Sequence, residues 1–81
     1  MKGNLENKNC LLTGATGGLG TEIAKTLLDY KCNIFLTSKS SIKLKKLQNE
    51  LKTKNDNNCK IKFQNGDLTK ISDIKKIINK I

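Results

Sequence analysis

Short apolar runs along the chain predict three β-strands. CLLT at 10–13 ends at a glycine, and CNIFLTS at 32–38 is rich in β-prone residues, as buried strands often are. CKIKF at 59–63 alternates apolar and polar residues, which is typical of a half-buried or edge strand. We therefore expect strands at 9–13, 32–37 and 60–64.

Between and after these runs the apolar residues recur at helical spacing, so that each segment has one apolar face. The three faces consist of Leu19, Ile23 and Leu27; of Leu44, Leu47 and Leu51; and of Ile71, Ile74, Ile78 and Ile81. Ser40 and Ser41 are N-cap candidates for the second helix, because a serine hydroxyl can accept a free backbone N–H. Residues 1–8 are a polar lead-in, and 52–58 form a polar loop.

The predicted order is β-α-β-α-β-α. Strands that alternate with helices favour right-handed crossovers and a parallel sheet. We expect an α/β fold with strand order 3-2-1 and helices on both faces of the sheet.

The stretch TGATGGLG lies at the first strand-to-helix turn, where the helix N-terminus can bind an anion such as a diphosphate. Gly14 can take the sharp turn, Gly18 leaves room for phosphates, and Gly20 lets the helix pack closely. Thr13 and Thr16 can offer hydroxyls. The alternative is a glycine-rich turn that only permits a tight connection. The candidate diphosphate residues are Thr13, Gly14, Thr16, Gly17, Gly18, Leu19 and Gly20.

This stretch resembles the T-G-x-x-x-G-x-G signature of the short-chain dehydrogenases/reductases. IFLTSKS is similar to the second strand of NADP-preferring members, and FQNGDLTKISDIKKI to their third strand, Asp-hydrophobic pair and next helix. The resemblance covers the chain from about Asn7 to its end. It implies that residues 1–81 are the N-terminal part of an NAD(P)-binding Rossmann domain.

The loop fits two branches of that family. Because positions 17 and 18 are both glycine, it also matches T-G-x-x-G-x-x-G of the extended, NAD-dependent epimerases and dehydratases. The Lys-rich helix from about Ile42 and the short 65–70 segment look more like the compact branch, which includes 3-oxoacyl-acyl-carrier-protein reductases. Gly17 departs from the basic residue that NADP-using reductases often have there.

The residues after the second and third strands favour NADP over NAD. An NAD site has an acid about 20 residues beyond the glycines, and Ser38 takes that place here. Lys39 can neutralise a 2′-phosphate; the alternative is one more solvated lysine. Asp67 and Leu68 match the pair that the family places beside adenine, while Asp67 can equally serve as a turn residue.

No catalytic residue can be assigned. The family uses Tyr, Lys and Ser for proton transfer to or from a carbonyl or hydroxyl substrate. The single tyrosine is Tyr30, and position 34 is Ile rather than the lysine of Y-x-x-x-K. The chain therefore looks like the first third of such an enzyme. We expect an oxidoreductase of which this chain is only a part. It would take such a substrate only if a catalytic part follows, and the full-length form would be a homo-oligomer. The alternative is a non-catalytic nucleotide-binding module or an inert remnant.

Composition bears on the partners, metal sites and cellular location that we expect for the protein. The chain has 81 residues and a net charge of +9, but its 16 lysines are scattered and no RNA-binding aromatic motif accompanies them, so we expect no nucleic-acid partner. Three cysteines without histidine or C-x-x-C support neither a zinc site nor a disulfide framework. With no signal-length or membrane-length apolar stretch, we expect a soluble, cytoplasmic protein without a membrane partner.

Overall fold

The computed structural model describes residues 5–55 and 58–81 and confirms the predicted order of elements. The parts of the lead-in and the polar loop at 1–4 and 56–57 lie outside the described residues. The elements are β1 (Asn9–Thr13), α1 (Gly18–Asp29), β2 (Asn33–Thr37), α2 (Ser41–Lys52), β3 (Ile61–Phe63) and α3 (Ile71–Lys80). Among the described residues, no helix has the length and apolar character that crossing a membrane requires.

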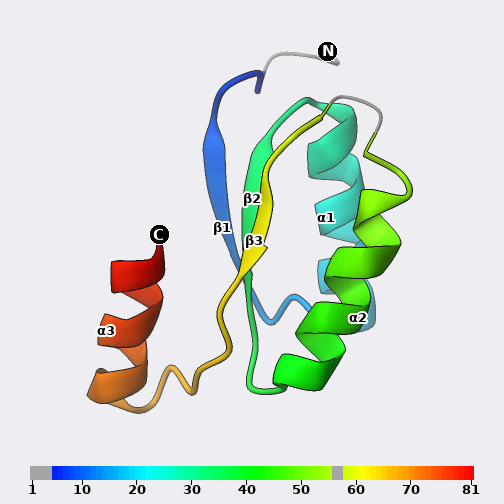
Figure 1. The fold of residues 1–81 in the computed structure, drawn as a ribbon. Helices are drawn as coiled ribbons and strands as arrows, with labels where there is room; N and C mark the ends of the chain where they lie inside the picture. Colours follow the sequence, from blue (N-terminus) through cyan, green and yellow to red (C-terminus); the bar gives the residue numbers. More distant parts are fainter. Residues whose placement is uncertain (1–4, 56–57) are drawn as a thin grey trace.

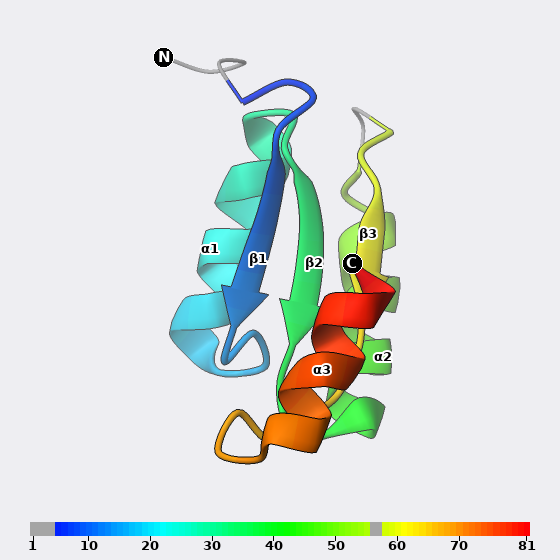
Figure 2. The same ribbon diagram turned by 90° about the vertical axis from the view of Figure 1, so that its left-hand side faces the viewer.

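The three strands form one parallel sheet with β2 in the middle, which is the predicted order read from the other edge. Residue Ile34 of β2 lies between Cys10 of β1 and Ile61 of β3 in the register. Helices α1 and α2 cover one face of the sheet and α3 lies on the opposite face (Figures 1 and 2). Helices on both faces are therefore confirmed.

The main core lies between the sheet and the α1–α2 layer. Ile34 and Leu36 of β2 pack there with Leu44 and Leu51 of α2, and the last three are fully buried. Burying a leucine side chain stabilises a fold by roughly 1.5–3 kcal/mol, so these few residues supply much of the hydrophobic driving force. The α2 helix is capped as predicted, because the Ser40 Oγ accepts the Lys43 N–H at 3.2 Å.

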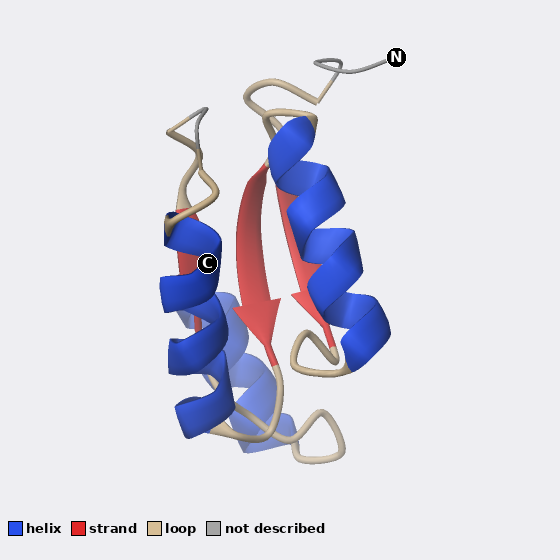
Figure 3. Ribbon diagram, turned by 90° about the vertical axis from the view of Figure 1, so that its right-hand side faces the viewer, coloured by secondary structure: helices blue, strands red, loops and turns tan. Residues whose placement is uncertain are grey.

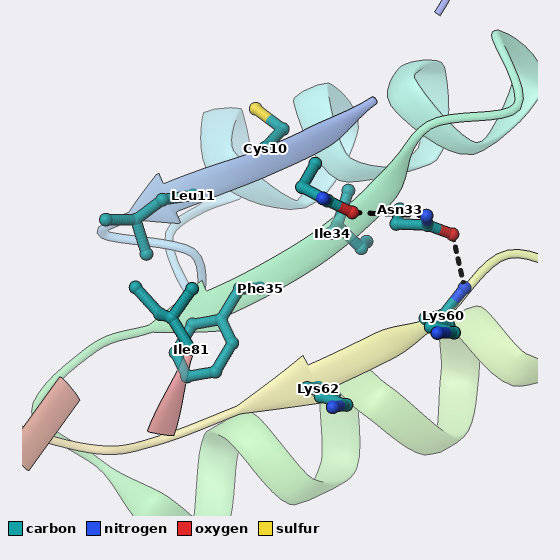
Figure 4. A pocket seen from close by; sticks show the side chains of 9 residues that line it. Cys10, Leu11, Asn33, Ile34, Phe35, Lys60, Lys62 and Ile81 are labelled. Atoms are coloured by element: carbon teal, nitrogen blue, oxygen red, sulfur yellow. Dashed lines mark hydrogen bonds between the residues drawn. The ribbon is translucent and has the colours of Figure 1, made fainter. Parts of the chain in front are cut away.

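The other face of the sheet is only partly covered. Phe35 is 7% exposed and lies beside Ile81, which follows α3, whereas Leu11 on the neighbouring strand is 49% exposed (Figure 4). A hollow of about 280 Å³ opens between these side chains. The α3 helix itself buries only Ile77.

The three cysteines are free thiols that fill space near the start of the sheet. Cys32 and Cys59 are buried, and Cys10 packs against the core. Burial raises the pKa of the Cys32 and Cys59 thiols, and the neighbouring thiols raise that of Cys32 further. Both are therefore protonated at neutral pH and act as small core residues.

The turn from β1 into α1 depends on two glycines. Gly14 has a φ of +62°, a left-handed conformation that glycine adopts without strain. Gly20 is buried inside α1, where an added Cβ would lie 2.5 Å from the Gly14 carbonyl oxygen and 3.0 Å from the Ala15 Cα. The close approach is to the backbone that follows β1 rather than to the strands themselves. It sets where α1 begins relative to the end of β1.

We expect Gly20→Ala to lower the free energy of unfolding by about 1–3 kcal/mol, because the new methyl group would overlap backbone atoms that cannot rotate away. The matched control is Gly18→Ala, where no atom lies within 4 Å of the added Cβ. That change should be neutral or stabilise the helix by up to about 1 kcal/mol. Thermal unfolding followed by circular dichroism measures both, and equal melting temperatures would refute the steric explanation.

A second prediction concerns the edge of the sheet. Within the described residues β1 pairs with β2 alone, so its other edge presents unpaired backbone groups. Such an edge favours pairing with another chain. We expect the isolated 81-residue chain to be poorly stable and to associate during size-exclusion chromatography. A monomer with a sharp transition above ~60 °C, beyond most of the mesophile range, would contradict this prediction.

Candidate functional site

The carboxyl ends of the three parallel strands lie at the same end of the sheet, and the loops that follow them lie together there (Figure 3). Two backbone hydrogen bonds join these loops. The Ala15 N–H donates to the Thr37 carbonyl oxygen at 3.2 Å, and the Gly66 N–H donates to the Ser38 carbonyl oxygen at 2.9 Å. Ala15 is also completely buried in the main core. The three loops are therefore held as a unit rather than as independent segments.

A hollow of about 400 Å³ lies between these loops. Ligand sites of α/β sheets lie in such a position, outside the carboxyl ends of the strands. Of the residues singled out from the sequence, the hollow brings together Gly14, Thr16, Ser38, Lys39, Asp67 and Leu68. Its other lining residues, which the sequence did not single out, are Thr37, Gly66 and Thr69.

The remaining candidates in the glycine loop do not line this hollow. Gly17 is the N-cap of α1, and Gly18 and Leu19 form the exposed start of the helix, with Leu19 77% exposed. The first N–H groups of a helix have no intrahelical partner, and Gly17 has no side chain to cap them. No acidic residue stands in the first turn either. This terminus therefore presents positive partial charge beside the hollow.

Thr13 and Gly20 have different surroundings. Thr13 is exposed at the end of β1, opposite Thr37 in the register, and does not line the hollow. Gly20 is buried against the Gly14 backbone and serves the packing of α1. Thr21 adds a link that the sequence did not suggest, since its hydroxyl donates to the Gly17 carbonyl oxygen at 3.1 Å.

Ser38 and Lys39 leave the end of β2 toward α2. The half-buried Ser38 Oγ accepts the Ser40 N–H at 3.3 Å, which orders the turn into the helix. Lys39 is exposed and forms no salt bridge within the described residues. The Lys39 ammonium is therefore free to meet an anion at the rim of the hollow.

Asp67 has a clear local role. Its Oδ1 accepts the Thr69 N–H at 2.9 Å and the Thr69 hydroxyl at 2.7 Å. These hydrogen bonds lower the pKa of Asp67, with smaller contributions from Lys39 and Lys70, so the carboxylate is ionised at neutral pH. Turn formation by Asp67 is thus confirmed. A carboxylate has room for further donors, and no described residue bonds to Oδ2, so a second role is compatible with the turn.

The start of α3 fixes the loop after β3. The Asp73 Oδ2 accepts the Asp67 N–H at 2.8 Å. At Gly66 an added Cβ would lie 3.0 Å from the Ile77 Cδ1, so this glycine lets α3 pack closely against the loop. NGD at 65–67 signals a turn in the sequence, but the contact with α3 could be found only in three dimensions.

Thr37 is the functional candidate that sequence reasoning missed. It lines the hollow, is 1% exposed, and its Oγ1 has no hydrogen-bond partner among the described residues. A threonine at the end of a β-prone run is ordinary in a sequence. The signal lies in the orphaned hydroxyl, which only the structure reveals.

Comparisons of the sequence and of the structure with known proteins point to the same family. The sequence profile of the family described as short chain dehydrogenase matches residues 8–81. Probable polyketide synthases 32 and 30 of Dictyostelium discoideum are each 39% identical over 80 residues. These matches cover 91% of this chain and only 2% and 3% of those proteins.

Solved structures agree with this result. A short-chain dehydrogenase/reductase (glucose/ribitol dehydrogenase) from Brucella melitensis is 28% identical with a TM-score of 0.82, over 98% of this chain and 32% of that one. An alcohol dehydrogenase from the archaeon Thermococcus sibiricus, complexed with 5-hydroxy-NADP, is 25% identical with a TM-score of 0.79, over 90% and 30%. The chain spans about a third of these enzymes. The profile match over nearly its whole length shows that the chain belongs to the short-chain dehydrogenase family.

Proposed function

We propose that residues 1–81 form the NADP(H)-binding segment of a short-chain dehydrogenase/reductase-type oxidoreductase. The observation that carries this proposal is the convergence of Ser38, Lys39 and Asp67 on one hollow beside the open N-terminus of α1. These groups offer the complementary charges that an adenosine phosphate needs. When bound, the cofactor would supply hydride exchange with a carbonyl or hydroxyl substrate.

The diphosphate is assigned to the start of α1. Its unpaired N–H groups and dipole favour an anion, and Gly17 and Gly18 leave the backbone accessible. No atom lies within 4 Å of the position that a Gly18 Cβ would take. We assign the phosphates to this open space, with the Thr16 hydroxyl beside it in the same loop.

The 2′-phosphate is assigned to the end of β2. Ser38 contributes no negative charge there, and the adjacent Lys39 ammonium has no competing salt bridge within the described part of the chain. A carboxylate at position 38 would instead repel the phosphate and favour the ribose 2′-hydroxyl of NAD. The similarity to an alcohol dehydrogenase complexed with 5-hydroxy-NADP supports the same cofactor.

Adenine is assigned to the Asp67–Leu68 side of the hollow. The Asp67 carboxylate is ionised and keeps an oxygen available beyond its bonds to Thr69, so it can accept the adenine amino group. Leu68 is 48% exposed and offers an apolar surface to the ring. The anion of Asp67 and the cation of Lys39 thus face different parts of the same adenosine.

What this segment would contribute to an oxidoreductase is binding rather than proton transfer. Tyr30 is the C-cap of α1, at the opposite end of the helix from Gly18, and it does not line the hollow. The chain corresponds to only 2–3% of the polyketide synthases that it matches. Their names support a role of the whole protein in polyketide synthesis.

We expect Lys39→Ala to weaken NADP(H) binding about ten- to a hundredfold and to leave NAD(H) binding nearly unchanged. A charge-assisted hydrogen bond to phosphate contributes ~1.5–3 kcal/mol, and NAD lacks that phosphate. Ser38→Asp should likewise weaken NADP(H) more than NAD(H), because an anion would face the 2′-phosphate. Dissociation constants of the purified protein for both cofactors measure these effects.

The matched control is Lys54→Ala, which removes an exposed lysine beyond the opposite end of α2 and makes the same change in net charge. It should leave both dissociation constants within about twofold, since exposed charges farther apart than the Debye length are largely screened. If Lys39→Ala weakens both cofactors alike, Lys39 does not recognise the 2′-phosphate and the preference for NADP has no support.

Gly18→Val tests the diphosphate assignment. The valine side chain enters open space in the free protein, so the fold should persist, but it would occupy the place assigned to the phosphates. We expect NAD(H) and NADP(H) to bind at least about tenfold more weakly, a loss of ~1.4 kcal/mol or more. Circular dichroism checks the fold. Unchanged affinities in a folded Gly18→Val variant would place the diphosphate elsewhere.

A further inference from the structure

We infer that the Thr37 hydroxyl is a hydrogen-bonding partner of the adenosine part of the dinucleotide. This inference rests on the proposed function and deepens it. It adds the last residue of β2 to a site that otherwise consists of loop residues and a helix terminus.

The evidence begins with an unsatisfied polar atom. Thr37 is the one buried residue with a polar or charged side chain in the described core, at 1% exposure, and its Oγ1 has no partner there. Its backbone carbonyl is already occupied by the Ala15 N–H. The great majority of buried polar side-chain atoms in proteins are hydrogen-bonded. An orphaned hydroxyl therefore needs an explanation, and a ligand group is one.

The position of Thr37 points to the ligand. Thr37 lines the hollow, with Ser38 and Lys39 following it in the chain and Gly66 and Asp67 on the neighbouring loop. Because so little of Thr37 is exposed, it contributes to the floor of the hollow rather than to its rim. A group that reaches it must enter between the residues assigned to the 2′-phosphate and those assigned to adenine, which is where the adenosine would lie.

The chemistry of the hydroxyl fits that location. Adenosine carries both hydrogen-bond acceptors, at its ring nitrogens and hydroxyls, and donors, at its amino group and hydroxyls. An ionised Asp67 can only accept and Lys39 can only donate, whereas a threonine hydroxyl does both. The Thr37 hydroxyl can therefore pair with an adenosine acceptor or donor, and it adds no net charge.

The same reasoning separates binding from stability. In the free protein a buried, unpaired hydroxyl stabilises nothing, and valine would fill nearly the same volume without a polar atom. If the hydroxyl serves the ligand, Thr37→Val should weaken binding while the melting temperature of the free protein stays the same or rises. If the hydroxyl serves the fold, through a buried water for example, Thr37→Val should lower the melting temperature and leave binding unchanged.

The experiment uses isothermal titration of adenosine 2′,5′-bisphosphate into the purified protein and four variants. We expect Thr37→Val to bind about three- to tenfold more weakly, the loss of one neutral hydrogen bond. Thr37→Ser keeps the hydroxyl and should stay within about twofold of the unaltered protein. Thr26→Val is the matched control, since Thr26 is exposed on α1 and bonds to the Glu22 carbonyl oxygen. Lys39→Ala tests the proposed function in the same series.

The outcomes distinguish the two proposals. If the unaltered protein binds and Lys39→Ala weakens binding, but Thr37→Val binds equally well, the inference on Thr37 is wrong and the proposed function stands. Equal losses in Thr37→Ser, which keeps the hydroxyl, and in Thr37→Val, which lacks it, would assign the effect to disturbed packing at the end of β2 and overturn the inference too. If the folded, unaltered protein does not bind the probe, both proposals fail together.

Discussion

The arrangement of the site depends on two consecutive carbonyl groups at the end of the central strand. Thr37 and Ser38 accept N–H groups from Ala15 and Gly66, which belong to the loops after β1 and β3. The central strand can bond to both loops because it has a neighbouring strand on each side. In a parallel sheet the carboxyl ends of all strands lie at the same end of the sheet. Without these bonds the loop ends would be separate, and Lys39 and Asp67 would have no fixed relation.

The sequence predicts most of the fold because the spacing of apolar residues differs between strands and helices. Strand β2 is in addition buried on both faces, so its sequence is an apolar run. The strand bounds agree with the prediction to within one residue, and the differences at the strand starts have local causes. Strand β2 begins at Asn33 rather than at 32, because the Cys32 N–H bonds to the Leu27 carbonyl oxygen of α1 instead of joining the ladder. Strand β3 begins at Ile61 rather than at 60, where the Lys60 N–H is taken by the Asn33 side chain. Side chains and helix ends compete with the sheet for these backbone N–H groups, and the spacing of apolar residues in the sequence does not reveal such hydrogen bonds.

The glycine loop shows what a motif can and cannot reveal. Gly14 and Gly20 are required by the backbone itself, one for its left-handed φ and one for the contact between them. Gly18 meets nothing in the free protein, so folding alone gives no reason for a glycine there. In the proposed complex this open space takes the diphosphate. The pattern of glycines predicts the turn, but only the structure separates the glycines that build the turn from Gly18, which the fold does not require.

Charge and position explain why the proposed function assigns the 2′-phosphate to Lys39 among the sixteen lysines. Most lysines of this chain act through a diffuse positive field that salt screens. Lys39 instead follows the end of β2 and lines the hollow together with Asp67. Because Thr69 holds that carboxylate in its ionised form, the hollow keeps a cation on one side and an anion on the other at neutral pH. In the proposed complex this separation orients the adenosine, with its phosphate toward Lys39 and its amino group toward Asp67, and Thr37 lies where a neutral partner is needed between them.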